Sequence, residues 1–291
     1  EVFSEMLQQH LKKGWSYPKA FSEALTCYFP DRGAELAMPN NILGLSYIIA
    51  LHRLRSSIRP FTVRREKASY HEAAPSDDRI ASATAIRQSW LKTGGLESIR
   101  PYVPQATYEL LSQTVREGGE PVTWESFRQV LFTRLVTLTE AELRDYPEVE
   151  EGLEYRLKRQ LKKAESVHDY LNALKTKRYT WNRLQRTLTY ILLGLTKTDL
   201  VSLNLDAGPT YIRVLGFTDR GKALLKEMRE KAALPVFTRI RQDHPSMLEW
   251  DIKAGAVYAL ATNGRLPITT ESLMTPAYFP AAGDGGSFSK Y

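Results

Sequence analysis

The stretch Pro39-Asn40-Asn41-Ile42-Leu43-Gly44 decides how the first part of the chain is read. The paired asparagines precede apolar residues that recur every three or four positions from Ile42 to Ile49. This pattern predicts a helix over residues 40–54, with an Asn side chain capping its first turn. A helix start of this kind leaves backbone N–H groups free at the positive end of the helix dipole, where phosphate groups bind. The stretch therefore predicts an anion site.

A second stretch, Ile80-Ala81-Ser82-Ala83-Thr84-Ala85-Ile86-Arg87, has the same character. Ser82 and Thr84 supply hydroxyls at a predicted helix start, and Arg87 is expected within the first turn, close to the same dipole end. We expect this helix to stop at Gly94-Gly95. Between the two stretches, residues 59–63 have strand character and end in the basic pair Arg64 and Arg65. This order suits the closing part of an α/β nucleotide-binding domain of Rossmann type.

Length and composition limit the remaining possibilities. A chain of 291 residues with 43% hydrophobic content can bury one large or two moderate cores. A single cysteine, Cys27, excludes an internal disulfide and fits a reducing compartment. The five histidines are too scattered for a helix-borne metal pair, so we expect no metal site built from side chains alone. No apolar run approaches the length of a membrane span, and we expect a soluble, cytoplasmic protein.

The positive charge is concentrated in one segment. Residues 154–186 carry ten basic and three acidic side chains, a net of +7, which equals the net charge of the whole chain. Apolar residues from Leu153 to Leu174 recur at helical spacing and predict one long amphipathic helix, and a second helix is expected to begin near Thr180. Arginines beside aromatic side chains grip phosphates and stack on unpaired bases. We therefore expect nucleic-acid contacts from Arg156, Arg159, Lys162, Lys163, Lys175, Lys177, Arg178, Tyr179, Arg183 and Arg186.

The organisation along the chain follows from these patterns. Residues 1–28 are expected to be helical with a break at Gly14, and residues 102–195 almost wholly helical. Residues 211–217 and 234–239 are strand candidates that bracket a helix over 221–233. The fold class expected is α/β but predominantly helical: the C-terminal part of a Rossmann-like nucleotidyltransferase domain (residues 1–100), then a mainly α-helical RNA-binding domain (101–275) and a flexible tail (276–291).

Six segments carry a family resemblance. They are residues 39–44, Ile80 to Arg87, Glu151-Gly152-Leu153-Glu154, Lys175-Thr176-Lys177-Arg178-Tyr179-Thr180, Arg183-Leu184-Gln185-Arg186 and Tyr211-Ile212-Arg213-Val214-Leu215-Gly216-Phe217. In this order, over about 180 residues, they resemble the bacterial tRNA(Met) cytidine acetate ligase family, which is related to nucleotidyltransferases. The resemblance implies an enzyme that activates acetate with ATP as acetyl-adenylate. The acetyl group then passes to the N4 amine of the wobble cytidine in elongator tRNA(Met).

The resemblance also implies roles for particular residues. Asn40 or Asn41 would contact the nucleotide, and Gly44 would let the helix backbone approach it. The phosphates would be faced by Arg64 or Arg65 and by Ser82, Thr84 and Arg87. Mg²⁺ is expected to bind through the ATP phosphates. The basic segment would bind tRNA, and neither DNA nor a membrane is an expected partner.

The sequence departs from the family in one important respect. No HxGH-type segment, which the family uses at its ATP site, occurs in the 291 residues. The chain opens at Glu1 with helical spacing already established, as though it enters in mid-domain. We therefore expect a fragment that lacks part of the ATP site and is inactive as it stands. A non-catalytic RNA-binding module and a nucleotidyltransferase acting on a small metabolite remain alternative functions.

Each assignment also has a purely structural interpretation. The asparagines and Ser82 to Thr84 are compatible with simple helix caps, and Arg87 with a surface ion pair. The basic run is compatible with a solvated helix face, and Tyr179 and Trp181 with core positions. Residues 215–217 are expected to form a packing turn without chemistry.

Overall fold

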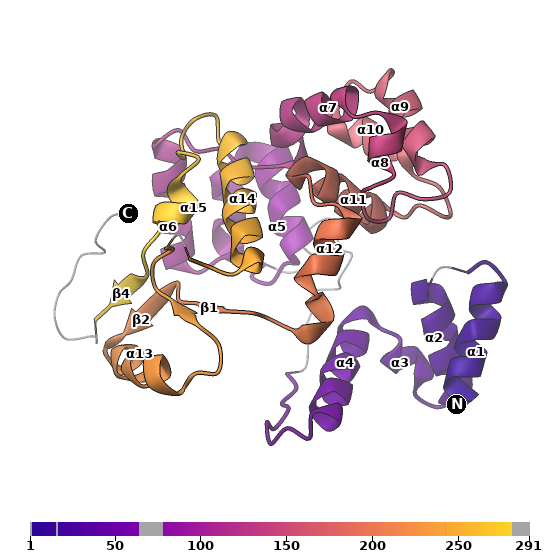
Figure 1. The fold of residues 1–291 in the computed structure, drawn as a ribbon, viewed down its shortest axis with the longest axis horizontal. Helices are drawn as coiled ribbons and strands as arrows, with labels where there is room; N and C mark the ends of the chain where they lie inside the picture. The colour runs from indigo at the N-terminus through magenta and orange to yellow at the C-terminus, as the bar shows by residue number, and fades with distance from the viewer. Residues whose placement is uncertain (1, 16, 64–77, 242, 281–291) are drawn as a thin grey trace. The chain divides into compact units, whose positions relative to one another are not determined.

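A computed structural model describes residues 2–15, 17–63, 78–241 and 243–280. The chain divides into two compact units, Glu1–Ile86 and Arg87–Tyr291. The helices of the first unit are α1 (Val2–Lys12), α2 (Tyr17–Tyr28), α3 (Gly33–Leu36) and α4 (Pro39–Arg53). The helix α5 (Ala83–Ser89) carries the division between the units. Figure 1 shows the elements of each unit in chain order.

The first unit is held together by α1, α2 and α3. Ala20, Ala24 and Leu25 of α2 are buried, and the ring of Phe3 packs edge-on against the rings of Phe21 and Tyr28. Gly33 opens α3 where a Cβ atom would lie 2.3 Å from Cα of Thr26. Only glycine fits at that distance, so the contact of α3 with α2 depends on this residue. The break expected at Gly14 and the helix expected over 40–54 are both confirmed.

The strand expected over residues 59–63 is wrong. These residues have no regular structure, and the side chains of Phe61 and Val63 are 90% and 95% exposed. β-branched and aromatic residues favour a strand only where a neighbouring strand pairs with them. Within the described residues the first unit contains no strand, so the Rossmann-like sheet expected there is not seen.

The helices of the second unit that follow α5 form most of its mass. They are η1 (a π-helix, Trp90–Gly94), the 3₁₀-helices η2 (Leu96–Tyr102), η3 (Trp124–Phe127) and η4 (Leu205–Ala207), and the α-helices α6 (Gln105–Arg116), α7 (Arg128–Thr137), α8 (Glu140–Leu143), α9 (Leu153–Leu161), α10 (Val167–Leu174), α11 (Trp181–Leu193), α12 (Lys197–Leu203), α13 (Asp219–Lys231), α14 (Ser246–Leu260) and α15 (Thr270–Leu273). The helical end expected at Gly94-Gly95 is confirmed. Residues 102–195, expected to be almost wholly helical, are mainly helical, with non-helical segments at 117–123, 144–152, 162–166 and 175–180.

The main core lies between α7, α9, α10 and α11. Its fully buried leucines include Leu131, Leu157, Leu171, Leu184 and Leu188, which come from all four helices. The apolar stripe from Leu153 to Leu174 is therefore buried, as its spacing predicted. The expected single helix is wrong, however, because α9 ends at Leu161 and α10 begins at Val167. Ser166 caps α10 by accepting a hydrogen bond from the Asp169 N–H at 3.0 Å, which starts a new helix.

Among the described residues of the C-terminal region, four short strands form two parallel pairs. The strands β1 (Ile212–Arg213) and β3 (Val236–Phe237) make one pair, and β2 (Gly216–Thr218) and β4 (Ala277–Phe279) make the other. Both expected strand regions and the helix between them are present, although residues 214–215 interrupt the first. The tail that was expected to be flexible from residue 276 begins with β4; residues 281–291 lie outside the described part.

Candidate functional site

The start of α4 differs in detail from the expected cap. Met38 is the N-cap residue and Pro39 stands at the beginning of the helix, so both asparagines lie within its first turn. The Asn41 side chain does not cap α4; its amide donates a hydrogen bond to the carbonyl oxygen of Glu35, before the helix, at 2.8 Å. The expectation that an asparagine caps this helix is therefore wrong. Proline is preorganised for the first helical position, so the helix begins at Pro39, before both asparagines.

The face of α4 near Asn40 and Gly44 is open. Asn40 is exposed, and a Cβ atom built on Gly44 would meet none of the described atoms within 4 Å. The first turn of α4 contains no acidic residue. These three features are compatible with an anion at the helix start, and the assignments of Asn40, Asn41 and Gly44 to a nucleotide stay predictions.

The start of α5 is occupied by a structural contact. Ser82 is buried, and its hydroxyl accepts a hydrogen bond from the Ala85 N–H at 3.1 Å, which caps the helix. Thr84 lies in the first turn and is half-buried. Arg87 belongs to the last turn of this seven-residue helix, so its expected place in the first turn is wrong. The two further ATP-site candidates, Arg64 and Arg65, lie outside the described residues.

Three motif segments that are separate in the sequence meet in the second unit. We call this cluster the Glu148 hub; it comprises residues 148–152, 176, 178, 179, 183 and 186. The Glu148 carboxylate contacts Arg183 (Nε to Oε2, 3.6 Å) and Arg186 (Nε to Oε1, 2.5 Å). Arg178 Nη1 lies 3.0 Å from the Glu151 carboxylate. The segments 151–154, 175–180 and 183–186 thus form one physical unit.

Tyr179 lies at the centre of the hub as a core residue. Its side chain is 6% exposed, its hydroxyl donates to the carbonyl oxygen of Glu150 at 3.2 Å, and the guanidinium of Arg183 lies over its ring at 5.2 Å. The Thr176 hydroxyl accepts hydrogen bonds from the N–H groups of Arg178 and Tyr179, which fixes the turn before α11. Because Tyr179 is enclosed in this way, its expected contact with nucleic acid is not supported by its position.

The backbone of the hub is strained. Glu148 and Glu151 have φ values of 64° and 55°, in the left-handed region that side chains with a Cβ avoid. Gly152 follows at φ 85° as the N-cap of α9. Such residues cost about 1–3 kcal/mol each and persist where the surroundings hold them. This loop is held by the ion pairs to Arg178, Arg183 and Arg186 together with hydrogen bonds from Tyr179 and Arg183 to its backbone carbonyl oxygens.

An ion pair between a buried carboxylate and a half-exposed arginine adjoins the hub. The side chain of Glu154 is 5% exposed, and Arg144 Nε lies 2.9 Å from its carboxylate. Burial raises the pKa of the Glu154 carboxyl, but the hydrogen bond from Arg144, with a backbone hydrogen bond and the charge of Lys197, outweighs burial, so its pKa is lowered overall. Glu154 is therefore ionised in the folded protein at neutral pH.

Half of the ten residues expected to contact nucleic acid have internal roles. Besides the four in the hub, Arg156 donates to the carbonyl oxygens of Ala173 and Leu174 at the end of α10, at 2.5 and 3.0 Å. The other five are exposed and, within the described ranges, their side chains form no hydrogen bond or ion pair: Arg159, Lys162, Lys163, Lys175 and Lys177. These five residues, which we call the exposed basic set, are the ones available to an anionic partner.

The exposed basic set lies at both ends of the α9–α10 pair. Arg159, Lys162 and Lys163 stand at the end of α9, whereas Lys175 and Lys177 follow α10. Because Arg156 near the start of α9 contacts the last residues of α10, Lys175 lies close to that end. At a rise of about 1.5 Å per helical residue, the two groups are about 10 Å apart along α9. The positive surface is therefore extended, as a nucleic-acid backbone requires.

The segment 211–217 serves as an anchor for the C-terminal region. Tyr211 donates a hydrogen bond to the carboxylate of Asp251 on α14, and Arg213 pairs with Glu271 on α15. Burial, and then the charge of Glu271, raises the pKa of the Asp251 carboxyl. These residues line a cavity of about 600 Å³. The packing turn expected over residues 215–217 is wrong, because Gly216 and Phe217 belong to strand β2. A Cβ atom on Gly216 would lie 2.9 Å from the ring of Phe279 on the paired strand β4.

Sequence reasoning missed Glu148 and Glu151, the carboxylates that organise the hub. The charge count began at residue 154, immediately after the acidic residues that fold back onto the basic ones.

Among the described residues no group of three or more His, Cys, Asp or Glu side chains could hold a metal ion. None of the helices that the structure describes combines the length and the apolar character that crossing a bilayer requires.

Comparison with known proteins gives a consistent result. A family model described as HIGH Nucleotidyl Transferase matches residues 1–271. A tRNA(Met) cytidine acetate ligase of Bacillus cereus (strain AH187) is 38% identical over 261 residues, which are 89% of this chain and 66% of that protein. The ligase of Bacillus licheniformis (strain ATCC 14580) is 40% identical over 260 residues, 88% of this chain and 62% of that protein. The chain thus spans just under two thirds of these relatives.

Two solved structures resemble the fold. The crystal structure of Thermotoga maritima TmcAL in apo form has a TM-score of 0.84 and 28% sequence identity, and covers 96% of this chain and 71% of that chain. TmcAL bound with alpha-thio ATP has a TM-score of 0.81, 28% identity, and covers 96% and 70%. The fold of this chain is therefore the helix-rich α/β fold of these structures.

Proposed function

Because the chain belongs to the HIGH nucleotidyl transferase family, among the tRNA(Met) cytidine acetate ligases, we propose that it takes part in the ATP-dependent acetylation of tRNA(Met) by acetate. Similarity to these ligases along most of the chain carries the proposal. In it, the first unit supplies the asparagine part of an ATP pocket and the second unit supplies a tRNA-binding surface. Such a protein would work in the cytoplasm, where tRNA is found.

The proposed reaction has two steps. An oxygen of the acetate carboxylate attacks the α-phosphorus of ATP, and the bond to the bridging oxygen breaks, so that acetyl-adenylate forms and pyrophosphate leaves. The N4 amine of the wobble cytidine of elongator tRNA(Met) then attacks the acetyl carbon, AMP leaves, and the amine loses a proton. The first step builds negative charge on the phosphoryl oxygens, and oriented N–H groups stabilise such charge.

The open start of α4 supports a role in this first step. Asn40 is exposed, Gly44 leaves space for a ligand beside the helix, and no carboxylate in the first turn would repel phosphate. We assign Asn40, Asn41 and Gly44 to the nucleotide, with Thr84, Arg87 and either Arg64 or Arg65 toward the phosphates. Ser82 would act through its cap on α5, because its hydroxyl already accepts the Ala85 N–H.

Magnesium would come with the nucleotide. Since the described residues contain no cluster of metal-ligating side chains, they do not make a magnesium site on their own. Mg²⁺ is commonly held by substrate phosphates with few protein ligands. We therefore assign the ion, if the reaction uses it, to the ATP phosphates.

The exposed basic set supports a role in tRNA binding. Its five side chains are free of internal partners among the described residues and extend along the α9–α10 pair. Phosphate contacts of this kind give binding that weakens steeply with salt. A module that binds RNA without catalysis would show the same salt dependence, so binding alone does not separate it from a ligase.

Exchange of labelled pyrophosphate into ATP tests the enzymatic part. The 291 residues hold no HxGH-type segment and are expected to be inactive alone. The ligase proposal therefore expects exchange that depends on acetate and is weakened by Asn40→Ala when that segment is supplied, and no exchange without it. Salt-sensitive tRNA binding with no exchange under any condition would instead favour the RNA-binding module. Exchange that proceeds without acetate but with another small metabolite would favour a nucleotidyltransferase of that metabolite.

A further inference from the structure

One face of α13 carries three basic side chains without acidic partners. Lys222, Lys226 and Arg229 follow one another at intervals of four and three residues, which places them on the same side of the helix. All three are exposed and, within the described part of the chain, form no ion pair or hydrogen bond. Lys231 contrasts with them, since its Nζ lies 2.7 Å from the Glu227 carboxylate.

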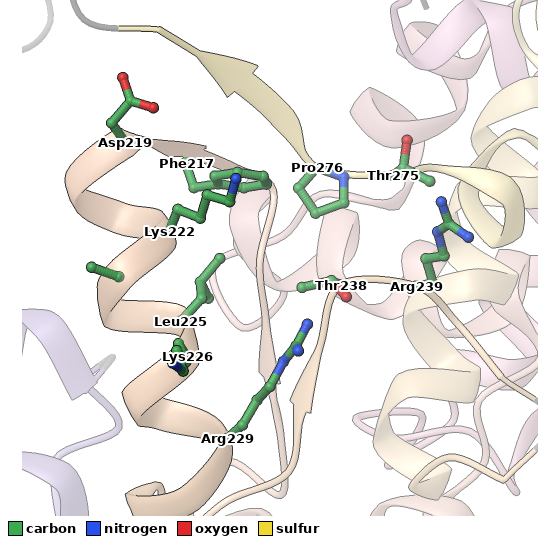
Figure 2. A pocket seen from close by; sticks show the side chains of 11 residues that line it. Phe217, Asp219, Lys222, Leu225, Lys226, Arg229, Thr238, Arg239, Thr275 and Pro276 are labelled. Carbon is green, nitrogen blue, oxygen red and sulfur yellow. The ribbon is translucent and has the colours of Figure 1, made fainter.

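This face forms one wall of a cleft of about 750 Å³. The opposite wall comes from residues 238–239, after β3, and 275–276, before β4. Figure 2 shows Arg229 reaching from α13 toward Thr238, with Arg239 on the far side of the cleft. Arg239 is also exposed and has no ion-pair partner among the described residues. Cationic groups therefore approach the cleft from both walls.

The lining contains four basic residues but only one acidic residue. That residue, Asp219, accepts a hydrogen bond from the hydroxyl of Tyr278 at 2.5 Å and lies in the first turn of α13, where the helix dipole stabilises a carboxylate. The Asp219 carboxylate thus interacts with Tyr278 and with the start of α13. The cleft keeps a net positive charge, which selects an anionic ligand.

The floor of the cleft is apolar. Phe217 and Leu225 are half-buried, and the Phe217 ring lies 5.6 Å from the ring of Tyr278, which holds it in place. Pro276 adds a second apolar surface. A phosphate ion would use the cationic rim but not this floor. An unpaired nucleotide uses both, because its base packs on aromatic and apolar groups while its phosphate meets lysine or arginine.

We propose that this cleft binds an unpaired nucleotide of an RNA strand, with the base against Phe217 and Leu225 and the flanking phosphates at Lys226, Arg229 and Arg239. The inference rests on the proposed function, in which the chain acts on tRNA, whose loops and end carry unpaired nucleotides. The cleft is a second RNA contact on the second unit, separate from the exposed basic set.

A pair of matched double variants tests the cationic rim. K226Q/R229Q removes two charges from the cleft face of α13, and R220Q/K231Q removes two from the opposite face, since Arg220 and Lys231 lie about half a helical turn away. For a short labelled single-stranded RNA, we expect the cleft variant to bind about tenfold more weakly and to lose about 1.4 from the salt slope, at about 0.7 per phosphate contact. We expect the control to bind within twofold of the unmodified chain. Equal losses in both variants, or no loss in either, would overturn the proposal.

The nature of the ligand is tested by competition and by Phe217→Leu, which keeps an apolar side chain but removes the aromatic face. We expect this variant to weaken the single-stranded RNA but not inorganic tripolyphosphate, with thermal melting showing that the fold is intact. If duplex RNA or tripolyphosphate competes as well as single-stranded RNA at equal phosphate concentration, the nucleotide assignment is overturned. Two variants separate the cleft from the proposed tRNA surface. If K162Q/K163Q leaves tRNA affinity unchanged while K226Q/R229Q lowers oligonucleotide affinity, the proposed tRNA surface fails and the cleft stands. If K162Q/K163Q lowers tRNA affinity while K226Q/R229Q leaves oligonucleotide affinity unchanged, the cleft alone is overturned.

Discussion

Oε1 of Glu148 lies 2.5 Å from Nε of Arg186, although 38 positions separate the two residues in the chain. The same carboxylate faces Arg183, and Glu148 has a left-handed backbone conformation. This contact shows that arginines which look available to RNA in the sequence are held by an acidic loop in the folded protein.

Replacing Glu148 by glutamine should destabilise the second unit. The change keeps the side-chain shape but leaves the partly buried Arg183 without its carboxylate, and we expect a loss of about 1–2 kcal/mol. For a unit of this size that corresponds to a decrease in melting temperature of about 3–6 °C. Glu150→Gln is the control, because Glu150 is exposed and only its backbone carbonyl contacts Tyr179. Identical melting curves for the two variants would contradict the role of the hub.

The exposed basic set and the hub arginines should respond differently to substitution. We expect K162Q/K163Q to weaken tRNA binding and to lower the salt slope by about 1 per lost contact, without a change in melting temperature. K12Q/K13Q, another adjacent pair of exposed lysines, is the matched control. R183Q/R186Q should mainly lower the melting temperature. Filter binding over a range of salt concentrations, together with thermal melting, separates these outcomes, and unchanged tRNA binding by K162Q/K163Q would identify α9 as a merely solvated surface.

Acid should destabilise the second unit through Glu154. Its pKa is lowered in the folded protein, so its contribution to stability is fully present above the ordinary value of 4.5 and is lost as pH falls through the lower folded value. Asp199, whose pKa is lowered by hydrogen bonds from Thr196, adds to the same loss. Urea unfolding between pH 7 and pH 3 should show stability decreasing below about pH 4.5. Glu154→Gln should make this decrease shallower; a profile as steep as that of the unmodified chain would exclude Glu154 as a source.

Gly44→Ala should separate stability from nucleotide binding. Alanine is better than glycine by about 1 kcal/mol in the middle of a helix, and the added methyl group meets none of the described atoms. We therefore expect α4 to become more stable. If the nucleotide approaches the helix backbone at this point, the same methyl group should lower the affinity for an ATP analogue, measured by calorimetry. A variant that is more stable and binds the analogue normally would remove Gly44 from the proposed site.

The sequence predicted the elements whose signals are local. The helices at residues 2–12, 39–53 and 181–193 follow from apolar spacing and from their flanking residues, and the buried stripe from Leu153 to Leu174 was read correctly. The break between α9 and α10 was missed because the apolar spacing continues through it. The feature that marks the start of a new helix is the cap that the Ser166 side chain makes on α10, and the apolar spacing does not reveal it.

Features that depend on distant partners were not predictable in the same way. The segment 59–63 has strand-forming residues but no strand beside it among the described residues, whereas β1 and β2 have partners more than twenty positions away. The prediction of the candidate tRNA site also failed where residues distant in the sequence meet. A count of charges along the chain could not show that Glu148 and Glu151 neutralise arginines that follow them by some thirty residues.

The parallel pairing of β2 with β4 has a consequence for biosynthesis. Residues 277–279 are made about 60 residues after their partners at 216–218. At about 5–20 residues per second, a growing polypeptide on the ribosome holds β2 with an open edge for about 3–12 seconds. An open edge can recruit strands from neighbouring chains. Translation that pauses before residue 277 should therefore favour aggregation of the nascent product, and prompt completion should protect it.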